Sequence, residues 1–159
     1  MREDKKTLIV FSGDLDKAMA AFIIATGAAA MGNEVTMFFT FWGLNILRKA
    51  KRVQVKKNLL EKLFGWMMPR GPEKLGLSKM NFAGLGPWMM KLMMRQKNVN
   101  TLPELIEQAQ ALGVKIIACS MSMDIMGIHP EELIDGIEYA GVASYLGEAD
   151  EANVNLFIA

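Results

Sequence analysis

The sequence has little of the residues that cross-link small proteins. Of its 159 residues, one is a cysteine and one is a histidine. A lone cysteine excludes an intrachain disulfide framework, and together with a single histidine it excludes a cysteine/histidine zinc cage within one chain. We therefore expect no resident metal and no bound cofactor, and a reducing compartment.

Long apolar runs are also missing. The longest uncharged stretch, residues 18–33, has 16 residues, fewer than the roughly 20 that a membrane-spanning helix needs. The first seven residues carry charges of both signs and lack the apolar run and cleavage site of a signal peptide. We therefore predict a cytoplasmic protein. A chain of this length is expected to form one domain over residues 1–159, and it can bury roughly 70% of the surface that its unfolded form exposes.

The net charge of +1 conceals two regions of opposite sign. Residues 42–100 hold 13 Lys and Arg and two acids, a net charge of +11, while the remainder holds five Lys and Arg and 15 acids, a net charge of −10. The basic region also contains all three tryptophans and seven of the 14 methionines. These features predict a basic, Met- and Trp-rich helical insertion over about residues 42–100.

Two interpretations of this insertion stay open. In the first, its Met and Trp side chains pack inward while Lys and Arg face solvent. In the second, the Met and Trp side chains form an adaptable apolar surface with a basic rim. The second kind of surface suits peripheral contact with an anionic membrane or a partner protein. We expect no nucleic-acid binding, because the positive charge is mixed with bulky apolar residues.

Strand and helix patterns alternate along the rest of the chain. Short β-branched and aromatic runs predict strands, and amphipathic or alanine-rich segments with capping residues predict helices. Asp14 is expected to cap the first helix, and Thr101 with Glu104 resembles a capping box. The expected strands are 7–11, 34–40, 114–118, 137–139 and 154–158, and the expected helices are 15–31, 44–50, 55–64, 88–95, 101–112, 120–126 and 142–151, with a helical turn over 130–134. This order predicts an open α/β sandwich with a mostly parallel sheet.

Ligands of such folds gather at the carboxyl ends of the strands, so the residues there are the candidates for chemistry. Cys119 follows the third strand and precedes a short helix, a placement that favours the nucleophilic thiolate. The alternative is that Cys119 is a small buried hydrophobe, as free cysteines often are. His129 and Asp124 are interpreted first as capping or surface residues, and second as groups beside the thiol. Ser12 and Asp14 lack the glycine spacing of a phosphate loop, which argues against nucleotide binding.

Three segments resemble a known family. Residues 11–18 (FSGDLDKA), 35–44 (VTMFFTFWGL) and 118–127 (ACSMSMDIMG) are similar to the DsrE/DsrF/DsrH-like family, in its DsrE-type branch that is sometimes labelled peroxiredoxin-like. The resemblance covers nearly the whole chain. It implies a three-layer α/β/α sandwich with a five-stranded, mainly parallel sheet, assembly into homo-oligomers such as trimers or hexamers, and a sulfur relay in which the family cysteine, matched by Cys119, carries a persulfide. A peroxidase cycle with two cysteines in one chain is disfavoured, because the chain has no resolving cysteine.

These observations lead to three hypotheses. The first is a sulfur carrier or sulfurtransferase subunit in which Cys119 relays sulfur between donor and acceptor proteins, and the residues predicted to shape its pocket are Ser12, Asp14, Trp42, Ser120, Ser122, Asp124 and His129. The second is a non-catalytic oligomeric binding module that docks on a membrane or a redox partner through the basic insertion. The third is a soft-metal site formed by Cys119 with Met121 and Met123, for which core packing is the simpler explanation.

Overall fold

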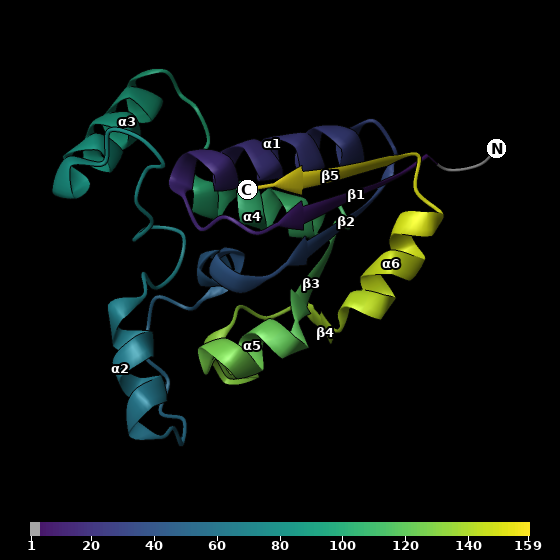
Figure 1. The fold of residues 1–159 in the computed structure, drawn as a ribbon. Helices are drawn as coiled ribbons and strands as arrows, with labels where there is room; N and C mark the ends of the chain where they lie inside the picture. Colours follow the sequence, from purple (N-terminus) through teal and green to yellow (C-terminus); the bar gives the residue numbers. More distant parts are fainter. Residues whose placement is uncertain (1–3) are drawn as a thin grey trace.

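A computed structural model describes residues 4–159, which are built around a five-stranded sheet (Figure 1). The strands lie in the order β4-β3-β2-β1-β5, and every neighbouring pair is parallel. Their bounds are β1 Lys5–Val10, β2 Glu34–Phe39, β3 Lys115–Cys119, β4 Glu138–Ala140 and β5 Val154–Ile158. All five predicted strands are confirmed, with β5 at its predicted bounds and the ends of the others shifted by at most two residues.

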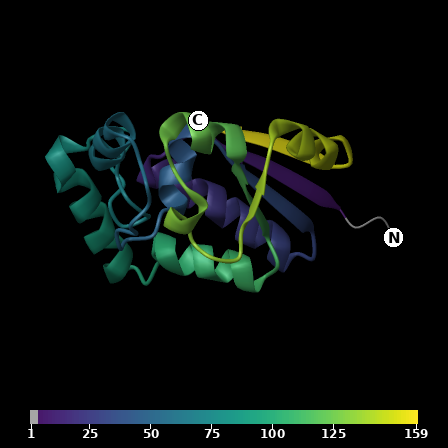
Figure 2. The same ribbon diagram turned by 90° about the horizontal axis from the view of Figure 1, so that it is seen from below.

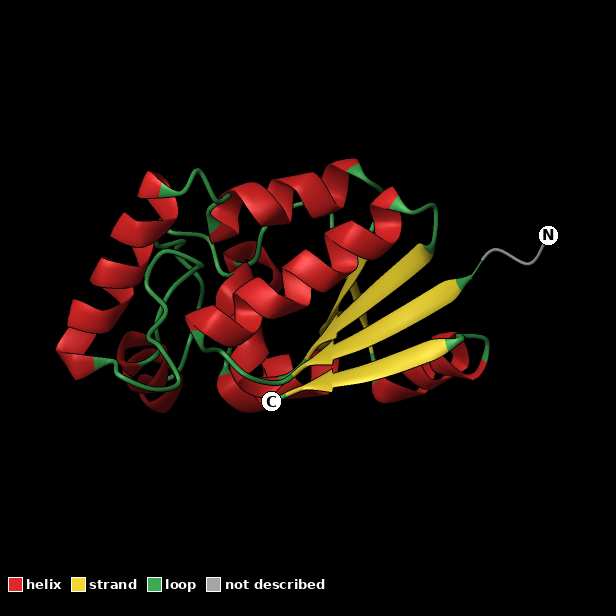
Figure 3. Ribbon diagram, turned by 90° about the horizontal axis from the view of Figure 1, so that it is seen from above, coloured by secondary structure: helices red, strands yellow, loops and turns green. Residues whose placement is uncertain are grey.

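Helices cover both faces of the sheet, which confirms the three-layer α/β/α architecture (Figures 1 and 3). One face packs against α1, Leu15–Ala30, and α4, Leu102–Ala111, and this side holds the larger apolar core. The other face packs against α6, Val142–Asp150, over a smaller cluster of buried side chains. Because side chains alternate along a strand, the central strands β1, β2 and β3 contribute to both cores.

Asp14 occupies the N-cap position of α1, but its side chain does not cap the helix. The carboxylate instead accepts a hydrogen bond from the Ser12 hydroxyl at 3.0 Å and pairs with Lys17 at 3.4 Å. The predicted capping role of Asp14 is therefore wrong. A serine two residues earlier in the same turn competes with the helix for the carboxylate.

Two predicted helices in the middle of the chain are displaced. The segment predicted as helix 44–50 is instead a 3-10 helix, η1, over Phe41–Leu47, after which Arg48 is extended and forms an antiparallel bridge with Leu133. The bridge is held by backbone hydrogen bonds from Lys49 to the Glu132 carbonyl at 2.8 Å and from Ile134 to the Leu47 carbonyl at 2.9 Å. A pairing between segments 85 residues apart has overridden the local helical pattern.

The helix predicted over 55–64 begins four residues later, as α2 over Leu59–Met67. Its start is fixed by a capping box, in which the Asn58 side chain accepts from the Glu61 N–H at 2.8 Å and the Glu61 carboxylate accepts from the Asn58 N–H at 3.0 Å. The pattern is the same as at Thr101 and Glu104, where a capping box opens α4 as expected.

Helices α2 and α3, Leu85–Gln96, stand beside the α/β core at the carboxyl end of the sheet (Figures 1 and 2). Much of their apolar surface is uncovered, with Trp66 69% and Trp88 61% exposed. Of the seven methionines in the insertion, only Met68 is buried. The interpretation that the Met and Trp side chains pack inward is therefore wrong for most of them. The structure instead shows the second interpretation, an exposed apolar surface among basic residues.

Candidate functional site

The carboxyl ends of the central strands meet at one edge of the sheet, as predicted. In the strand register, Val10 is paired with Phe39, Phe39 with Ala118, and Cys119 with Ala140. The segments that follow β1, β2 and β3 therefore leave the sheet side by side. Most of the sequence-predicted site residues lie in these segments.

The loops after β1 and β2 are locked together by a close backbone approach. The Gly43 N–H donates to the Phe11 carbonyl at 2.9 Å, and a Cβ at Gly43 would lie 2.1 Å from the carbonyl oxygen of Val10. Only glycine fits at such a distance. The loop that carries Trp42 is thus fixed against the end of β1.

Cys119 ends β3 and is the N-cap residue of α5, Ser120–Met126. Its side chain is 2% exposed and belongs to the smaller cluster, with Phe38, Ile117 and Tyr145. Alternation along β3 explains this position, since Ile117 and Cys119 point to the face under α6 while Ile116 and Ala118 point to the larger core. In the single chain the thiol is covered, as in the alternative of a small buried side chain.

Helix α6 packs on the cluster that contains Cys119, and one aromatic side chain anchors the helix there. The Tyr145 ring stacks on Phe38 with centroids 5.1 Å apart, and its hydroxyl forms a hydrogen bond of 3.1 Å with the Thr7 hydroxyl. Tyr145 is the one buried residue of α6. The apolar contact between α6 and the sheet is therefore small.

Ion pairs supply the rest of the attachment of α6. The Glu148 carboxylate lies 2.5 Å from the Lys5 ammonium and 2.8 Å from the Lys115 ammonium. The hydrogen bonds from Lys115 and Lys5 hold the pKa of Glu148 below its usual value. The same hydrogen bonds to the Glu148 carboxylate raise the pKa of both lysines. The charged contacts make the seating of α6 sensitive to ionic strength.

The structure divides the seven predicted pocket residues into groups. Ser120, Asp124 and His129 line one pocket of about 410 Å³, together with Glu61 and Tyr139. The remaining residues are elsewhere: Ser12 bonds to Asp14, Ser122 is buried and bonds to the Thr40 hydroxyl at 2.7 Å, and Trp42 is exposed beside Phe64. The Cys119 side chain is not among the residues that line this pocket.

Met121 and Met123 do not gather around the thiol. Met123 is buried in the larger core, whereas Cys119 belongs to the smaller one, and the Met121 side chain is exposed. Core filling accounts for Met123. Within residues 4–159, no three His, Cys, Asp or Glu side chains are placed to hold a metal ion together.

Tyr145 and Phe38, the aromatic residues of the cluster that contains Cys119, were not predicted from the sequence. The alternation of β2 placed Phe38 on one face, but nothing in the sequence specified which face α6 would cover.

In the part of the chain that the structure describes, no helix has the length and apolar character to cross a membrane.

Solved structures share this architecture. The ychN protein from E. coli superimposes with a TM-score of 0.55 at 12% identity, covering 96% of this chain and 98% of that one. The protein MTH1491 from Methanobacterium thermoautotrophicum superimposes with a TM-score of 0.58 at 11% identity, covering 97% and 99%. The five-stranded parallel sheet flanked by helices is therefore a known α/β fold.

Sequence similarity defines the family. Residues 2–157 match the DsrE/DsrF/DrsH-like family, and the chain belongs to it. The chain is 62% identical over 154 residues to the uncharacterized protein YrkE of Bacillus subtilis, covering 97% of this chain and 96% of that protein. It is 40% identical over 162 residues to the sulfur carrier protein DsrE2 of Allochromatium vinosum, covering 99% and 100%. The family resemblance expected from the sequence is confirmed.

Proposed function

We propose that the protein is a sulfur carrier that holds sulfane sulfur as a persulfide on Cys119. The observation that carries the proposal is the position of the chain's only thiol, at the edge where β2, β3 and β4 end. Support comes from the family and from the 40% identity to a protein named as a sulfur carrier. A relay needs one cysteine, and the sequence has one.

The transfer is an exchange between thiolates and needs no external oxidant. The Cys119 thiolate attacks the outer, sulfane sulfur of a donor persulfide, so that a bond forms between Sγ and that sulfur. The donor's S–S bond breaks and its inner sulfur leaves as a thiolate. The reverse exchange with an acceptor thiolate passes the sulfur on and regenerates the Cys119 thiolate, with charge and electrons balanced in both steps.

The buried thiol requires α6 to move for the exchange to occur. The helix has one buried side chain, Tyr145, and is otherwise held by side-chain ion pairs and a hydrogen bond of 3.1 Å from Asn155 to the Ala149 carbonyl. Segments with few buried apolar contacts open locally at a lower cost than global unfolding. Local displacement of α6 therefore exposes Sγ while the sheet stays intact. Assembly into trimers or hexamers stays a prediction.

Loading of Cys119 can be observed by intact mass. After incubation with thiosulfate, or with a cysteine desulfurase and cysteine, we expect the wild-type chain to gain the mass of about one sulfur atom. The gain should disappear on reduction and be absent from Cys119→Ala. Ser122→Ala, which changes a buried hydroxyl of α5 without touching the thiol, should still gain it. An unmodified wild type, or an equal gain on Cys119→Ala, would reject the carrier role.

A second candidate function rests on the exposed surface of α2 and α3. We infer that this surface docks on an anionic membrane. Trp66 and Trp88 are exposed on the two helices, and they belong to the segment with a net charge of +11. Exposed aromatic and apolar side chains beside Lys and Arg match the interface of a membrane that carries anionic lipids.

Co-sedimentation with vesicles tests this docking. We expect the wild type to sediment with vesicles that contain phosphatidylserine and to stay in solution with neutral vesicles. The double variant Trp66→Ala/Trp88→Ala should be released from the anionic vesicles, because the apolar anchors are lost while the charge is kept. Cys119→Ala should bind like the wild type. Equal binding by the tryptophan variant would exclude the α2 and α3 surface, and no binding by the wild type would exclude membrane docking.

A further inference from the structure

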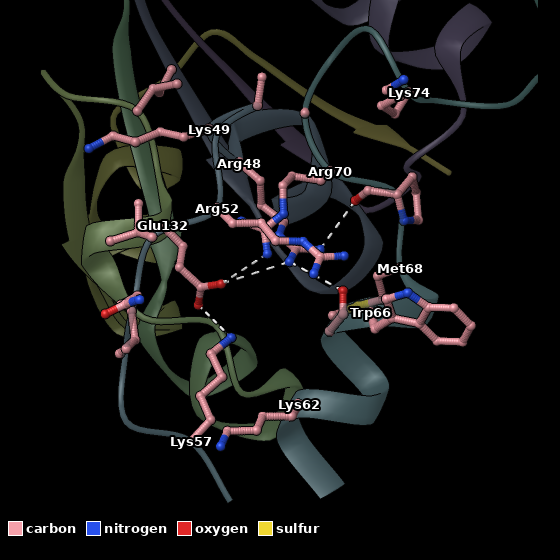
Figure 4. A pocket seen from close by; sticks show the side chains of 18 of the residues that line it. Arg48, Lys49, Arg52, Lys57, Lys62, Trp66, Met68, Arg70, Lys74 and Glu132 are labelled. Atoms are coloured by element: carbon pink, nitrogen blue, oxygen red, sulfur yellow. Dashed lines mark hydrogen bonds and ion pairs between the residues drawn. The ribbon is translucent and has the colours of Figure 1, made fainter. Parts of the chain in front are cut away.

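A large basic pocket lies between α2, the segments on either side of it and the turn before β4 (Figure 4). Its volume is about 1610 Å³, and it is lined by residues 48–50, 52–57, 61–62, 65–66 and 68–74 with Pro103, Glu132 and Ile134. Among residues 4–159, eight lysines and arginines line it against three glutamates. We call this cavity the basic pocket.

Glu132 lines the basic pocket and pairs with three of its cations. Its side chain is 1% exposed, and it lies 2.6 Å from the Lys57 ammonium, 3.5 Å from the Arg70 guanidinium and 3.8 Å from the Arg48 guanidinium (Figure 4). The His129 N–H also donates to it at 2.9 Å. Three cationic side chains therefore share one carboxylate, which leaves an excess of two positive charges.

The donors of the two arginines are incompletely used. Arg48 is fully buried, and its hydrogen bonds to Asn45, Pro69 and Gly65 are long, at 3.3 to 3.4 Å. Within the described part of the chain, the Nε of Arg48 and one terminal nitrogen of Arg70 are buried without a hydrogen-bond partner. Buried polar atoms of this kind are rare, and each calls for a partner.

Repulsion between the arginines agrees with this imbalance. Burial, together with the neighbouring charges of Arg70 and Arg52, lowers the pKa of Arg48 to about 10, although Glu132 opposes the shift. The carboxylate alone does not neutralise its surroundings. A second anion in the basic pocket would remove the repulsion and supply the missing acceptors.

We propose that the basic pocket binds a tetrahedral oxyanion of the phosphate or sulfate class, held by Arg48 and Arg70. Sulfate and the dianion of phosphate carry two negative charges, which match the excess, and several acceptor oxygens for guanidinium N–H groups. A monovalent carboxylate would leave one charge unmatched. The site is separate from the sulfur chemistry, because Cys119 does not line the basic pocket.

The oxyanion has two possible sources, a free ion or the phosphate headgroup of a lipid. Trp66 lines the basic pocket and is also exposed on the surface of α2. The pocket can therefore be reached from solvent by a free ion and from a membrane by a lipid headgroup. The shared requirement is a dianionic phosphate or sulfate group that reaches the two guanidinium groups. Binding of inorganic ions tests this requirement directly, and vesicles distinguish the sources.

Isothermal titration calorimetry with sodium sulfate and sodium phosphate, at an ionic strength held constant with sodium chloride, is the test. We expect saturable binding with one ion per chain, and no saturable binding of nitrate. Arg70→Gln should weaken the binding of sulfate about tenfold, because it removes one charge-assisted donor group. Arg95→Gln, on exposed α3 and outside the basic pocket, should bind sulfate like the wild type.

If Arg70→Gln does not fold, Arg52→Gln is the second variant. The Arg52 side chain lines the basic pocket but is exposed, so its replacement should weaken sulfate binding without unfolding the chain. A lipid source predicts that inorganic phosphate displaces the wild type from phosphatidic acid vesicles, and a free-ion source predicts that it does not. No saturable binding of sulfate and phosphate, or equal weakening by Arg70→Gln and Arg95→Gln, would overturn the proposal.

Discussion

Replacement of Tyr145 by alanine is expected to raise the rate at which Cys119 reacts with a thiol reagent by about tenfold or more. Truncation of a buried large aromatic side chain costs about 3 to 5 kcal/mol. If half of that cost favours the local opening of α6, the population with α6 open rises about tenfold or more. The ring of Tyr145 lies on Phe38 and closes the cluster that contains Cys119. The measurement is the rate of release of the chromophore from an aromatic disulfide under native conditions.

Tyr145→Phe is the matched control for this experiment. It keeps the ring over Phe38 and removes only the hydroxyl that bonds to Thr7. We expect its thiol to react at nearly the wild-type rate. Urea unfolding of each variant separates local opening from loss of the whole fold, since an opening of α6 leaves the slope of the unfolding transition unchanged. Equal reactivity of Tyr145→Ala and the wild type would show that α6 does not control access to the thiol.

The same variant connects the fold to the proposed chemistry. If Cys119 must be uncovered to meet a donor persulfide, Tyr145→Ala should also load sulfur faster than the wild type. High salt should act in the same direction on the wild type, because it screens the pairs of Glu148 with Lys5 and Lys115. Access to the thiol would then depend on a helix that has one fully buried side chain, Tyr145.

The order of strands and helices could be predicted from the sequence because it depends on local patterns. The apolar run of β2 and the capping box at Thr101 each lie within a few consecutive residues. The edge that carries Cys119 follows from the parallel sheet. The depth of the thiol could not be predicted in the same way, because it depends on which face α6 covers, and that choice is made by contacts between Tyr145 and distant strands.

The basic pocket shows a similar limit. The excess of Lys and Arg over residues 42–100 is visible in the sequence, but Glu132, which gathers three of them, lies outside that segment. The bridge between Arg48 and Leu133 brings the two regions together. No periodicity or spacing could have indicated this pairing, and the same bridge is what replaced the predicted helix over 44–50.

Replacement of Glu132 by glutamine is expected to lower the free energy of unfolding by about 3 kcal/mol at neutral pH, a typical cost of removing one partner from a buried ion pair. The change keeps the size of the side chain but leaves Arg48 and Lys57 without their counter-charge. Arg48 is fully buried, so a guanidinium left there without its counter-charge is costly. Urea denaturation at pH 7, with Glu107→Gln on the exposed side of α4 as the control, measures the difference.

The loss should depend on pH in a definite direction. Burial alone would raise the pKa of Glu132, but the His129 N–H and the charges of Lys57 and Arg48 outweigh it and hold this pKa below its ordinary value. A carboxylate with a lowered pKa contributes its full stabilisation above the pKa of the unfolded chain, about 4.3, and loses it as the pH falls through the lower pKa of the folded state. The wild type should therefore approach Glu132→Gln in stability as the pH is lowered from about 5. A difference between the two that stays constant down to acid unfolding would mean that Glu132 acts through packing and not through its charge.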